Sequence, residues 1–308
     1  MKRALLFPGQ GARGVLEAAA WLRGSELLAL ALDEARLSFD ELEAFGGRAL
    51  ERTEVLQPLL TALCLTVAER LGVTPEVVLG HSLGELAAAS AAGAFDARTA
   101  VRLAAQRGRL MAREAALNPG GLVALTSAAS LRASSAAKDD VPLGASSLGP
   151  SVAGRDDAPF ASTAGLELAA VNAPDELVCG GPLAALGAHR RVPVSGAWHT
   201  SAMRGALEEF RAALLAVAKP LSIALCRNLD GALTHDVGSL APQLAAPVQF
   251  ARALTTLVEA GVTTVICVGP GLVMRGLVRK NLGSRVKVLT TEDEADLTRT
   301  IAATQGTP

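Results

Sequence analysis

The chain has 308 residues, half of them hydrophobic, and a formal net charge of −1 from 29 basic and 30 acidic residues. This length is enough for one large core, or for a core domain that carries a smaller inserted one. The balanced charge excludes a global field that would hold nucleic acid or an anionic membrane surface, so an anionic ligand must be met by a local site.

The sequence indicates neither export nor a membrane span nor a metal site. The apolar stretch before Pro8 covers only residues 4–7, too short for a signal-peptide core, and no uncharged apolar run approaches the ~20 residues of a membrane span. The cysteines stand apart, without a CxxC pair or histidines at metal-ligand spacing. We therefore expect a cytoplasmic protein with four reduced core cysteines, Cys64, Cys179, Cys226 and Cys267.

The first 117 residues alternate short apolar runs with longer periodic ones. The short runs predict buried strands at residues 3–7 and 77–79. The longer runs predict helices over residues 15–36, 56–71, 83–92 and 97–117. Strands that alternate with helices imply an α/β fold with a mainly parallel, wound sheet.

The pattern changes after residue 117, at an Asn-Pro-Gly turn. Short strands are predicted at residues 122–126, 166–171, 176–179 and 192–195. Between the first two, residues 128–164 are rich in Ser, Gly, Pro and Asp, which predicts a long exposed low-complexity loop. We therefore expect residues 120–198 to form a small inserted domain, with 1–119 and 199–308 forming the larger one.

The helical period resumes after the middle segment. Helices are predicted over residues 204–218 and 247–260, and strands over residues 222–225 and 263–268. Gly269-Pro270-Gly271 then forms a sharp junction into another helix. The chain shows no repeat of the solenoid type.

The stretch "VVLGHSLGELAAASAAG", residues 77–93, drives an apolar run into a serine between glycines and at once begins a helix. Gly80, Ser82 and Gly84 fit the G-x-S-x-G elbow, in which small neighbours let the chain turn sharply and expose the serine hydroxyl. The backbone N–H of Leu83, at the positive end of that helix, is placed to stabilise an oxyanion. The alternative interpretation is a turn of small residues with a helix-capping serine.

A nucleophilic serine needs a base, and the chain offers four histidines. His81 points away from the serine next to it, and two others lie in a charged and a loop segment, His189 and His235. His199 remains by elimination, because "AWHTSAM" ends a strand-like segment and precedes a helix. Taken alone, it also fits a structural role. No acidic residue is an obvious partner for it, although Asp175 follows the serine in hydrolase order.

Two further segments are candidates for substrate binding. "FPGQG", residues 7–11, brings backbone N–H groups close to a ligand, and Gln10 could supply the second oxyanion donor. Arg107, in "AAQRGRLM", could hold a carboxylate through paired hydrogen bonds. The alternatives are an ordinary turn for the first segment and a solvated helix face for the second.

Taken together, the motifs resemble the malonyl-CoA:acyl carrier protein transacylases and the acyltransferase domains of polyketide and fatty acid synthases. The family's order is kept from residue 3 to about residue 280 by "FPGQG", "GHSLGE", "QRGRLM", "VNAP…VCGG", "WHTSAM", "PVQF" and "VGPG". The pair "GHSLGE" and "FPGQG" is specific, whereas each of the others is weak alone.

The resemblance implies an α/β-hydrolase-like large domain with an inserted ferredoxin-like small domain and an active site in the cleft between them. Ser82 would attack the thioester of an acyl-CoA, and His199 would take its proton. The backbone N–H groups of Gln10 and Leu83 would hold the oxyanion. Arg107 would hold the free carboxylate of a malonyl group, which favours a dicarboxylic acyl unit.

The resemblance also implies the remaining parts of the site. A main-chain carbonyl near "PVQF", expected at Gln249, would steady the histidine without an aspartate. His81 and Asn172 are expected among the substrate-binding residues. The phosphopantetheine thiol of an acyl carrier protein would accept the acyl group. Both steps exchange a thioester and an ester, so neither a metal nor a redox cofactor is expected.

The sequence departs from the family's pattern at four places. Arg13 stands where the family usually has glutamine. Residues 181–192 leave room for only a short stretch in place of a full helix, and the low-complexity loop replaces another, so we expect a reduced small domain. Trp198 precedes the histidine where related enzymes often have Phe for malonyl and Ser for methylmalonyl. Its bulk favours an unbranched unit, or it packs at the domain junction.

The leading hypothesis is therefore a malonyltransferase for fatty acid or polyketide synthesis. The alternatives are an acyl hydrolase that clears acyl carrier proteins, or a transferase for a larger acyl group; Arg107 favours transfer, and the reduced small domain favours the alternatives. An intact Ser82 and His199 argue against a non-catalytic docking module. An acidic carrier protein would be met by basic residues, for which the candidates are Arg190, Arg191, Arg275, Arg279 and Lys280.

Overall fold

A six-stranded sheet forms the centre of the computed structural model, which describes residues 2–125 and 165–305. The strand order is β10-β9-β1-β2-β7-β8, and all neighbours are parallel except β7 and β8. The strands are β1 (Lys2–Phe7), β2 (Val77–Gly80), β7 (Ala224–Cys226), β8 (Leu233–Thr234), β9 (Val262–Cys267) and β10 (Lys287–Thr290). The prediction of a mainly parallel α/β sheet is confirmed.

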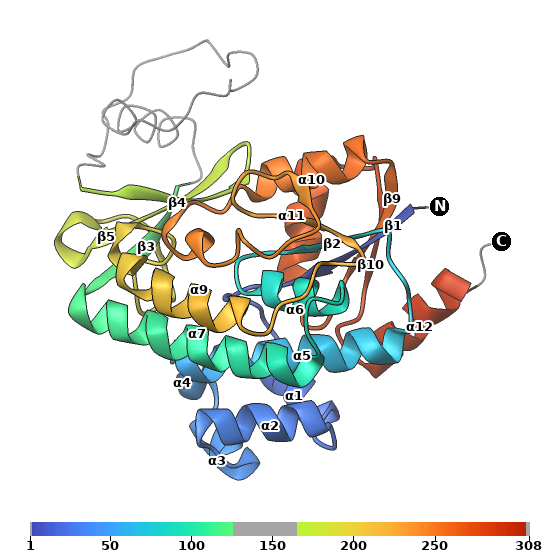
Figure 1. The fold of residues 1–308 in the computed structure, drawn as a ribbon, viewed down its shortest axis with the longest axis horizontal. Helices are drawn as coiled ribbons and strands as arrows, with labels where there is room; N and C mark the ends of the chain where they lie inside the picture. The colour runs from blue at the N-terminus through green and yellow to red at the C-terminus, as the bar shows by residue number, and fades with distance from the viewer. Residues whose placement is uncertain (1, 126–164, 306–308) are drawn as a thin grey trace, which may run out of the picture.

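The central strands are continuous apolar runs because helices cover both faces of the sheet. Residues 4–7 of β1 are at most 2% exposed. Figure 1 shows α5 (Thr53–Leu71) and α7 (Ala97–Leu117) side by side below the sheet, with α10 (Phe250–Glu259) and α11 (Leu272–Leu282) above it. Phe7 pairs with Gly80, so β1 and β2 end at the same level and their following loops meet at one edge.

The predicted helices are present, with differences at their ends. Residues 15–36 form two helices, α1 (Val15–Trp21) and α2 (Glu26–Ala35), because the chain turns at residues 22–25 and Ser25 caps the second. The helix predicted over residues 83–92 is α6 (Gly84–Ala91), and that over 204–218 is divided into η2 (Ser201–Ala206) and α9 (Leu207–Leu215). Within the described residues, three α-helices were not predicted: α3 (Phe39–Phe45), α4 (Gly47–Leu50) and α12 (Glu294–Gln305).

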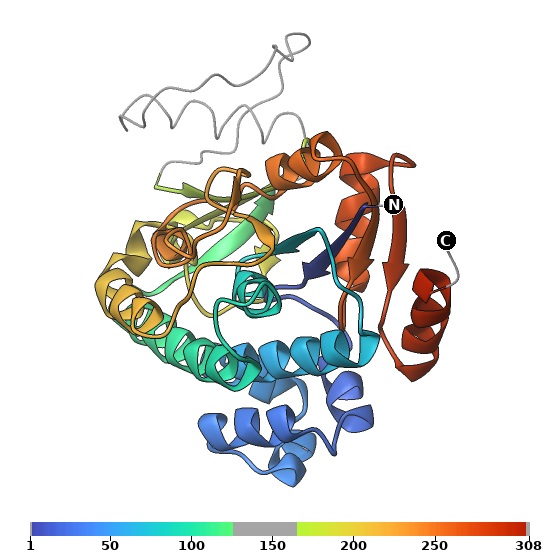
Figure 2. The same cartoon turned by 45° about the vertical axis from the view of Figure 1, so that its right-hand side comes forward.

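A second, four-stranded antiparallel sheet lies at one end of the first (Figure 2). Its order is β4-β5-β3-β6, with β3 (Gly120–Leu125), β4 (Glu167–Ala173), β5 (Glu176–Pro182) and β6 (Arg191–Val192). Between β5 and β6 the chain forms only the short turn η1 (Leu183–Ala185). This agrees with the prediction that residues 181–192 have no room for a full helix. The loop expected at residues 128–164 lies outside the described residues.

The small sheet is held to the rest of the molecule by backbone hydrogen bonds and by a shared core. Val248, just before α10, donates its N–H to the Ala169 carbonyl of β4 (2.9 Å) and accepts the N–H of Val171 (2.8 Å). The main apolar cluster also contains Leu122 and Val178 from the small sheet. The small sheet is therefore held in a fixed position relative to the edge where β1 and β2 end. Across the described residues, no helix has the length and apolar composition that crossing a membrane requires.

Candidate active site

Ser82 sits on a sharp turn between β2 and α6. Its φ is 52°, in the left-handed region that a non-glycine residue rarely adopts, and such strain is common at functional positions. A Cβ at Gly80 would overlap the backbone of Gly84, and a Cβ at Gly84 would overlap the carbonyl of Phe7. Both glycines are therefore required by close backbone approach, as the G-x-S-x-G interpretation predicts.

His199 lies against the serine, although 117 residues separate them. The distance from Ser82 Oγ to His199 Nε2 is 2.7 Å. Ser82 is 9% exposed and His199 is 6% exposed, so both are buried. His199 also has a positive φ, 63°, and its backbone N–H donates to the Leu244 carbonyl at 3.1 Å. The histidine chosen by elimination is thus the one in contact with the serine.

The carbonyl that orients His199 belongs to Gln243, not to Gln249 as expected. His199 Nδ1 lies 2.9 Å from the Gln243 oxygen. Gln243 Nε2 also lies 3.1 Å from Nδ1, but the shorter contact is to the carbonyl, which can only accept, so Nδ1 is assigned the hydrogen and Nε2 the lone pair that faces the serine. The turn η3 (Pro242–Ala245) presents this carbonyl, whereas Gln249 directly precedes α10 and donates its N–H to the Asn228 carbonyl at 2.7 Å. Asp175 is mostly exposed and pairs with Lys280, so it is not the partner of His199.

Arg107 brings a positive charge to the same hydroxyl. It lies on α7, is 2% exposed, and its Nη2 is 3.3 Å from Ser82 Oγ. Burial lowers the pKa of Arg107 to about 10, partly offset by the Glu85 carboxylate, so the guanidinium is charged at neutral pH. Burial and, next, this guanidinium lower the pKa of His199 to about 3. A neutral imidazole beside a serine is the form that accepts its proton.

Two residues that were not predicted hold Gln10 and Arg107 in place. Gln57 accepts from Arg107 Nη1 at 2.9 Å, and its Nε2 donates to Thr53 Oγ1 at 2.8 Å. Gln10 Nε2 donates to the same hydroxyl at 2.8 Å. Thr53 and Gln57 lie one turn apart on α5 and are at most 1% exposed. The signal in the sequence was the pair of polar residues one turn apart at the start of a helix whose next residues are mostly apolar.

The expected oxyanion donors lie at the starts of segments that follow β1 and β2. Leu83 precedes the first residue of α6, and its side chain is 1% exposed, so only its backbone N–H can serve a ligand. N–H groups at a helix start have no partner within the helix. Gln10 is half-buried in the loop after β1, with its side chain turned toward α5.

His81 and Asn172 meet across the two sheets. His81 Nε2 lies 2.9 Å from Asn172 Oδ1, and burial lowers the pKa of this histidine. Asn172 is on β4, and its carbonyl accepts from Asn281 Nδ2 at 2.8 Å. The pair joins the elbow to the small sheet.

Trp198 is 2% exposed, belongs to the main core and packs its ring on Gly196. This burial agrees with the packing alternative, and a substrate role for Trp198 stays a prediction. Arg13 is exposed. Of the basic residues suggested for a carrier protein, Lys280 is already paired at 3.0 Å with both Asp175 and Glu176.

The other suggested basic residues have different environments. Arg190, Arg191 and Arg279 are exposed, and Arg275 is half-buried. In the part of the chain that the structure describes, no group of three or more His, Cys, Asp or Glu side chains could hold a metal ion.

Comparison with known proteins gives matches over nearly the whole chain. The acyl transferase domain family matches residues 18–153. The malonyl CoA-acyl carrier protein transacylase of Bacillus subtilis is 30% identical, over 95% of this chain and 94% of its own length. The crystal structure of an acyl-carrier-protein S-malonyltransferase from Burkholderia pseudomallei is 27% identical, with a TM-score of 0.79 over 98% of this chain and 99% of that one.

A further solved structure shares the fold at 23% identity, with a TM-score of 0.77 over 98% of this chain and 100% of that one. It is a type II polyketide synthase acyl-carrier protein in complex with its malonyl-transacylase. The matches over whole lengths, together with the serine and imidazole in contact, define the protein as an acyltransferase. The chain belongs to the family of malonyl-CoA:acyl carrier protein transacylases and polyketide synthase acyltransferase domains.

Proposed function

We propose that this protein transfers a malonyl group from CoA to the phosphopantetheine thiol of an acyl carrier protein, through an ester on Ser82. The observation that carries the proposal is the position of one hydroxyl, 2.7 Å from His199 Nε2 and 3.3 Å from Arg107 Nη2. The names of the relatives from Bacillus subtilis and Burkholderia pseudomallei support the same reaction.

In the proposed first step, Ser82 Oγ attacks the thioester carbon while His199 Nε2 takes the hydroxyl proton. The C–S bond then breaks, and the proton passes from Nε2 to the leaving sulfur of CoA. The Gln243 carbonyl would stabilise the transient imidazolium through Nδ1–H. In the second step the carrier thiol gives its proton to Nε2 and its sulfur attacks the ester carbon. The C–O bond to Ser82 then breaks, and Oγ takes the proton back from Nε2.

Charge in this reaction develops on the carbonyl oxygen, and the proposed donors to it are the backbone N–H groups of Leu83 and Gln10. The position of Leu83 at the start of α6 supports this role, since the helix dipole favours negative charge there. The hydrogen bond from Gln10 to Thr53 supports a fixed loop. The chemistry exchanges an ester for a thioester of similar energy, so it requires no metal or redox cofactor.

The proposed selectivity comes from Arg107. Its buried guanidinium, held by Gln57, would bind the free carboxylate of a malonyl unit, and an acetyl group would leave that charge unpaired. We also assign His81 and Asn172 to the substrate side of the site, and the bulk of Trp198 to the preference for an unbranched unit.

The proposed architecture is an α/β-hydrolase-like domain, residues 1–119 and 199–308, with a reduced ferredoxin-like domain inserted at 120–198. The strand order β4-β5-β3-β6 supports the second description, and the elbow after β2 supports the first. The four free, buried cysteines support the proposed cytoplasmic location. Arg190, Arg191 and Arg279 are the exposed residues proposed to meet an acidic carrier protein.

Mass spectrometry of the intact protein tests the acyl-enzyme. After brief exposure to malonyl-CoA we expect a malonyl adduct on the wild type and none on Ser82→Ala. Methylmalonyl-CoA and acetyl-CoA are tested in the same way as alternative donors. No adduct from any of the three would contradict the proposal and favour a larger acyl group.

Arg107→Ala tests the carboxylate role and separates transfer from hydrolysis. This variant should lose the preference for malonyl over acetyl before it loses all acylation; equal labelling by both in the wild type would contradict the role. The shortened connection between β5 and β6 keeps an acyl hydrolase as the second candidate. Decay of the malonyl adduct in water as fast as in the presence of carrier protein would favour that hydrolase.

A further inference from the structure

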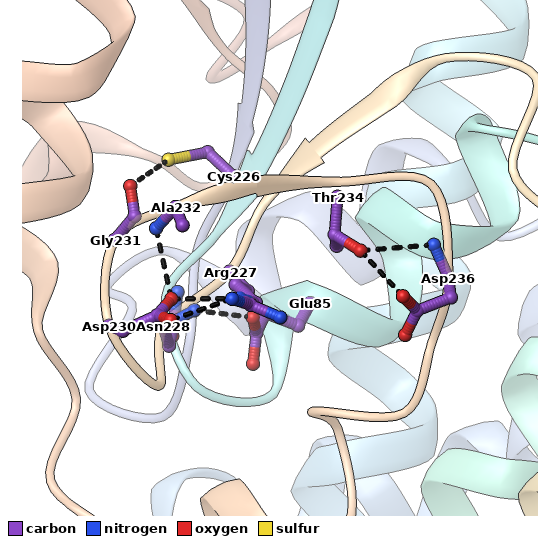
Figure 3. Close-up of polar contacts among 9 residues, drawn as sticks. All are labelled: Glu85, Cys226, Arg227, Asn228, Asp230, Gly231, Ala232, Thr234 and Asp236. Carbon is purple, nitrogen blue, oxygen red and sulfur yellow. Dashed lines mark hydrogen bonds and ion pairs between the residues drawn. The ribbon is translucent and has the colours of Figure 1, made fainter. Parts of the chain in front are cut away.

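Strand β7 runs beside β2 only as far as the last pair, Leu79 with Cys226. The chain then leaves the sheet through a tight loop, drawn in Figure 3, in which Arg227 and Ala232 share a backbone hydrogen bond of 3.0 Å. Arg227 and Asp230 form an ion pair of 2.7 Å across it. On this side, β2 therefore continues into the elbow without a neighbouring strand.

The side chain of Asn228 takes the place of that missing strand. Its Nδ2 donates to the Gly80 carbonyl at 2.7 Å, and its Oδ1 accepts the N–H of Ser82 at 2.6 Å. In a parallel ladder, a backbone residue opposite His81 would make the same two bonds, to the residue before and the residue after it. On the other side of β2, the N–H of His81 donates to the Phe7 carbonyl at 2.9 Å.

The elbow needs this partner because of its own geometry. Ser82 has the left-handed backbone and is 9% exposed, so its N–H points away from the β1 side into the protein interior. A buried N–H without an acceptor is costly, and a turn that can relax to another conformation would move the hydroxyl. Asn228, which is 0% exposed, supplies the acceptor and excludes water from it.

Asn228 is itself fixed from two sides. Its backbone N–H donates to Glu85 Oε1, in the first turn of α6, at 2.6 Å, and its carbonyl accepts the N–H of Gln249 at 2.7 Å. Glu85 is 2% exposed, and Figure 3 shows its carboxylate beside Asn228. One residue thus joins the end of β2, the start of α6 and the start of α10.

We propose that Asn228 is the positioning residue of the nucleophile: its carboxamide holds the strained elbow so that Ser82 Oγ stays in line with His199 Nε2. The inference rests on the proposed role of Ser82 as nucleophile. It assigns to Asn228 no contact with substrate. Its effect should appear in the rate of serine acylation and not in the affinity for the donor.

The test compares Asn228→Leu, which removes both hydrogen bonds, with Asn228→Asp, which keeps the size and the acceptor for Ser82. Asn118→Leu is the matched control, since the Asn118 side chain, at the end of α7, also makes two hydrogen bonds to the backbone: its Nδ2 donates to two carbonyls. Two rates are measured: single-turnover malonylation, and labelling by a fluorophosphonate, in which Ser82 Oγ bonds to phosphorus, fluoride leaves and His199 takes the proton.

For Asn228→Leu we expect both rates to fall on the order of 100-fold, as for a nucleophile displaced by about 1 Å, with unchanged malonyl-CoA affinity measured in a Ser82→Ala background. Asn228→Asp should lose less, and Asn118→Leu should match the wild type. Circular dichroism verifies folding; if Asn228→Leu does not fold, Asn228→Asp decides. Wild-type rates in a folded Asn228 variant, or an equal loss in Asn118→Leu, would overturn the inference.

The fluorophosphonate separates this proposal from the proposed function. If the wild type takes the fluorophosphonate on Ser82 but no malonyl group, the donor assignment has failed and the role of Asn228 is still measured. If malonylation proceeds while Asn228→Leu labels at the wild-type rate with both reagents, the role of Asn228 has failed and the transferase proposal stands.

Discussion

At the scale of single residues, the electrostatics of His199 determine how the site responds to pH. Its ring is buried, Arg107 lies nearby, and both lower its pKa to about 3. A general base works in its neutral form, so a lowered pKa keeps it active as the pH falls below the usual value of 6.5. The activity should therefore persist in acid.

We predict that fluorophosphonate labelling of Ser82 by the free enzyme is nearly as fast at pH 5 as at pH 8. An unperturbed histidine would be about 97% protonated at pH 5, and the rate would fall roughly 30-fold. The reagent carries no carboxylate, so its own titration does not interfere. Arg107→Gln is the informative variant: without the cation, the labelling rate should begin to fall at a higher pH than in the wild type. A wild-type rate that falls with a midpoint near pH 6.5 would contradict the prediction.

At the scale of elements, the contact between α5 and α7 sets the position of Arg107. A Cβ at Gly108 would lie 2.8 Å from both Glu54 Cα and the Thr53 carbonyl oxygen, closer than real contacts allow. The two helices touch backbone to backbone here, and Gln57 on α5 reaches Arg107 because of it. A larger residue at position 108 would force the helices apart.

We predict that Gly108→Ala lowers the free energy of unfolding by ~1–2 kcal/mol through overpacking, after the gain in helix propensity. The displaced Arg107 should also reduce the malonyl-to-acetyl labelling ratio. Gly276→Ala, on α11 where a Cβ meets open space, is the control and should raise stability by about 0.5–1 kcal/mol. Urea denaturation and intact mass measure the two effects. Equal behaviour of the two variants would show that the close approach does not matter.

How well each element could be predicted follows from its local signals. The helix at residues 97–117 was predicted with correct ends because Asp96 caps it and one face is apolar. Strand β10 is at the sheet edge with no fully buried residue, so no apolar run marked it. Helix α12 buries only Leu297 and Thr300, too few for a recognisable stripe.

At the scale of the whole molecule, the candidate site could be predicted where a local motif carries it or, for His199, where the chain offers few residues of the required type. The elbow is contained in residues 80–84, so Ser82 was visible in the sequence. The partners Gln243 and Asn228 were not, because their contacts with His199 and Ser82 span 44 and 146 positions and depend on how loops fold back on the sheet. Local spacing could not distinguish Gln243 from Gln249.

The two sheets should behave as one unit, although chains of this length often unfold domain by domain. Residues of the small sheet, among them Leu122 and Val178, belong to the same apolar cluster as the large sheet, and Val248, just before α10, makes two backbone hydrogen bonds to β4. Exposing the small sheet would therefore open the main core. Trp198 lies in this core and Trp21 on α1, and the chain has no tyrosine, so each tryptophan can be followed alone.

We predict that Trp198 fluorescence in Trp21→Phe and Trp21 fluorescence in Trp198→Phe each change at the thermal midpoint that far-UV circular dichroism gives for the same variant. Comparing probes within one variant removes the effect of the substitution on stability. If Trp198 fluorescence changed at a temperature well below the circular dichroism midpoint, while Trp21 fluorescence changed at that midpoint, the small sheet would open independently. In that case the shared core would not couple the two sheets, and the site between them would open before the molecule unfolds.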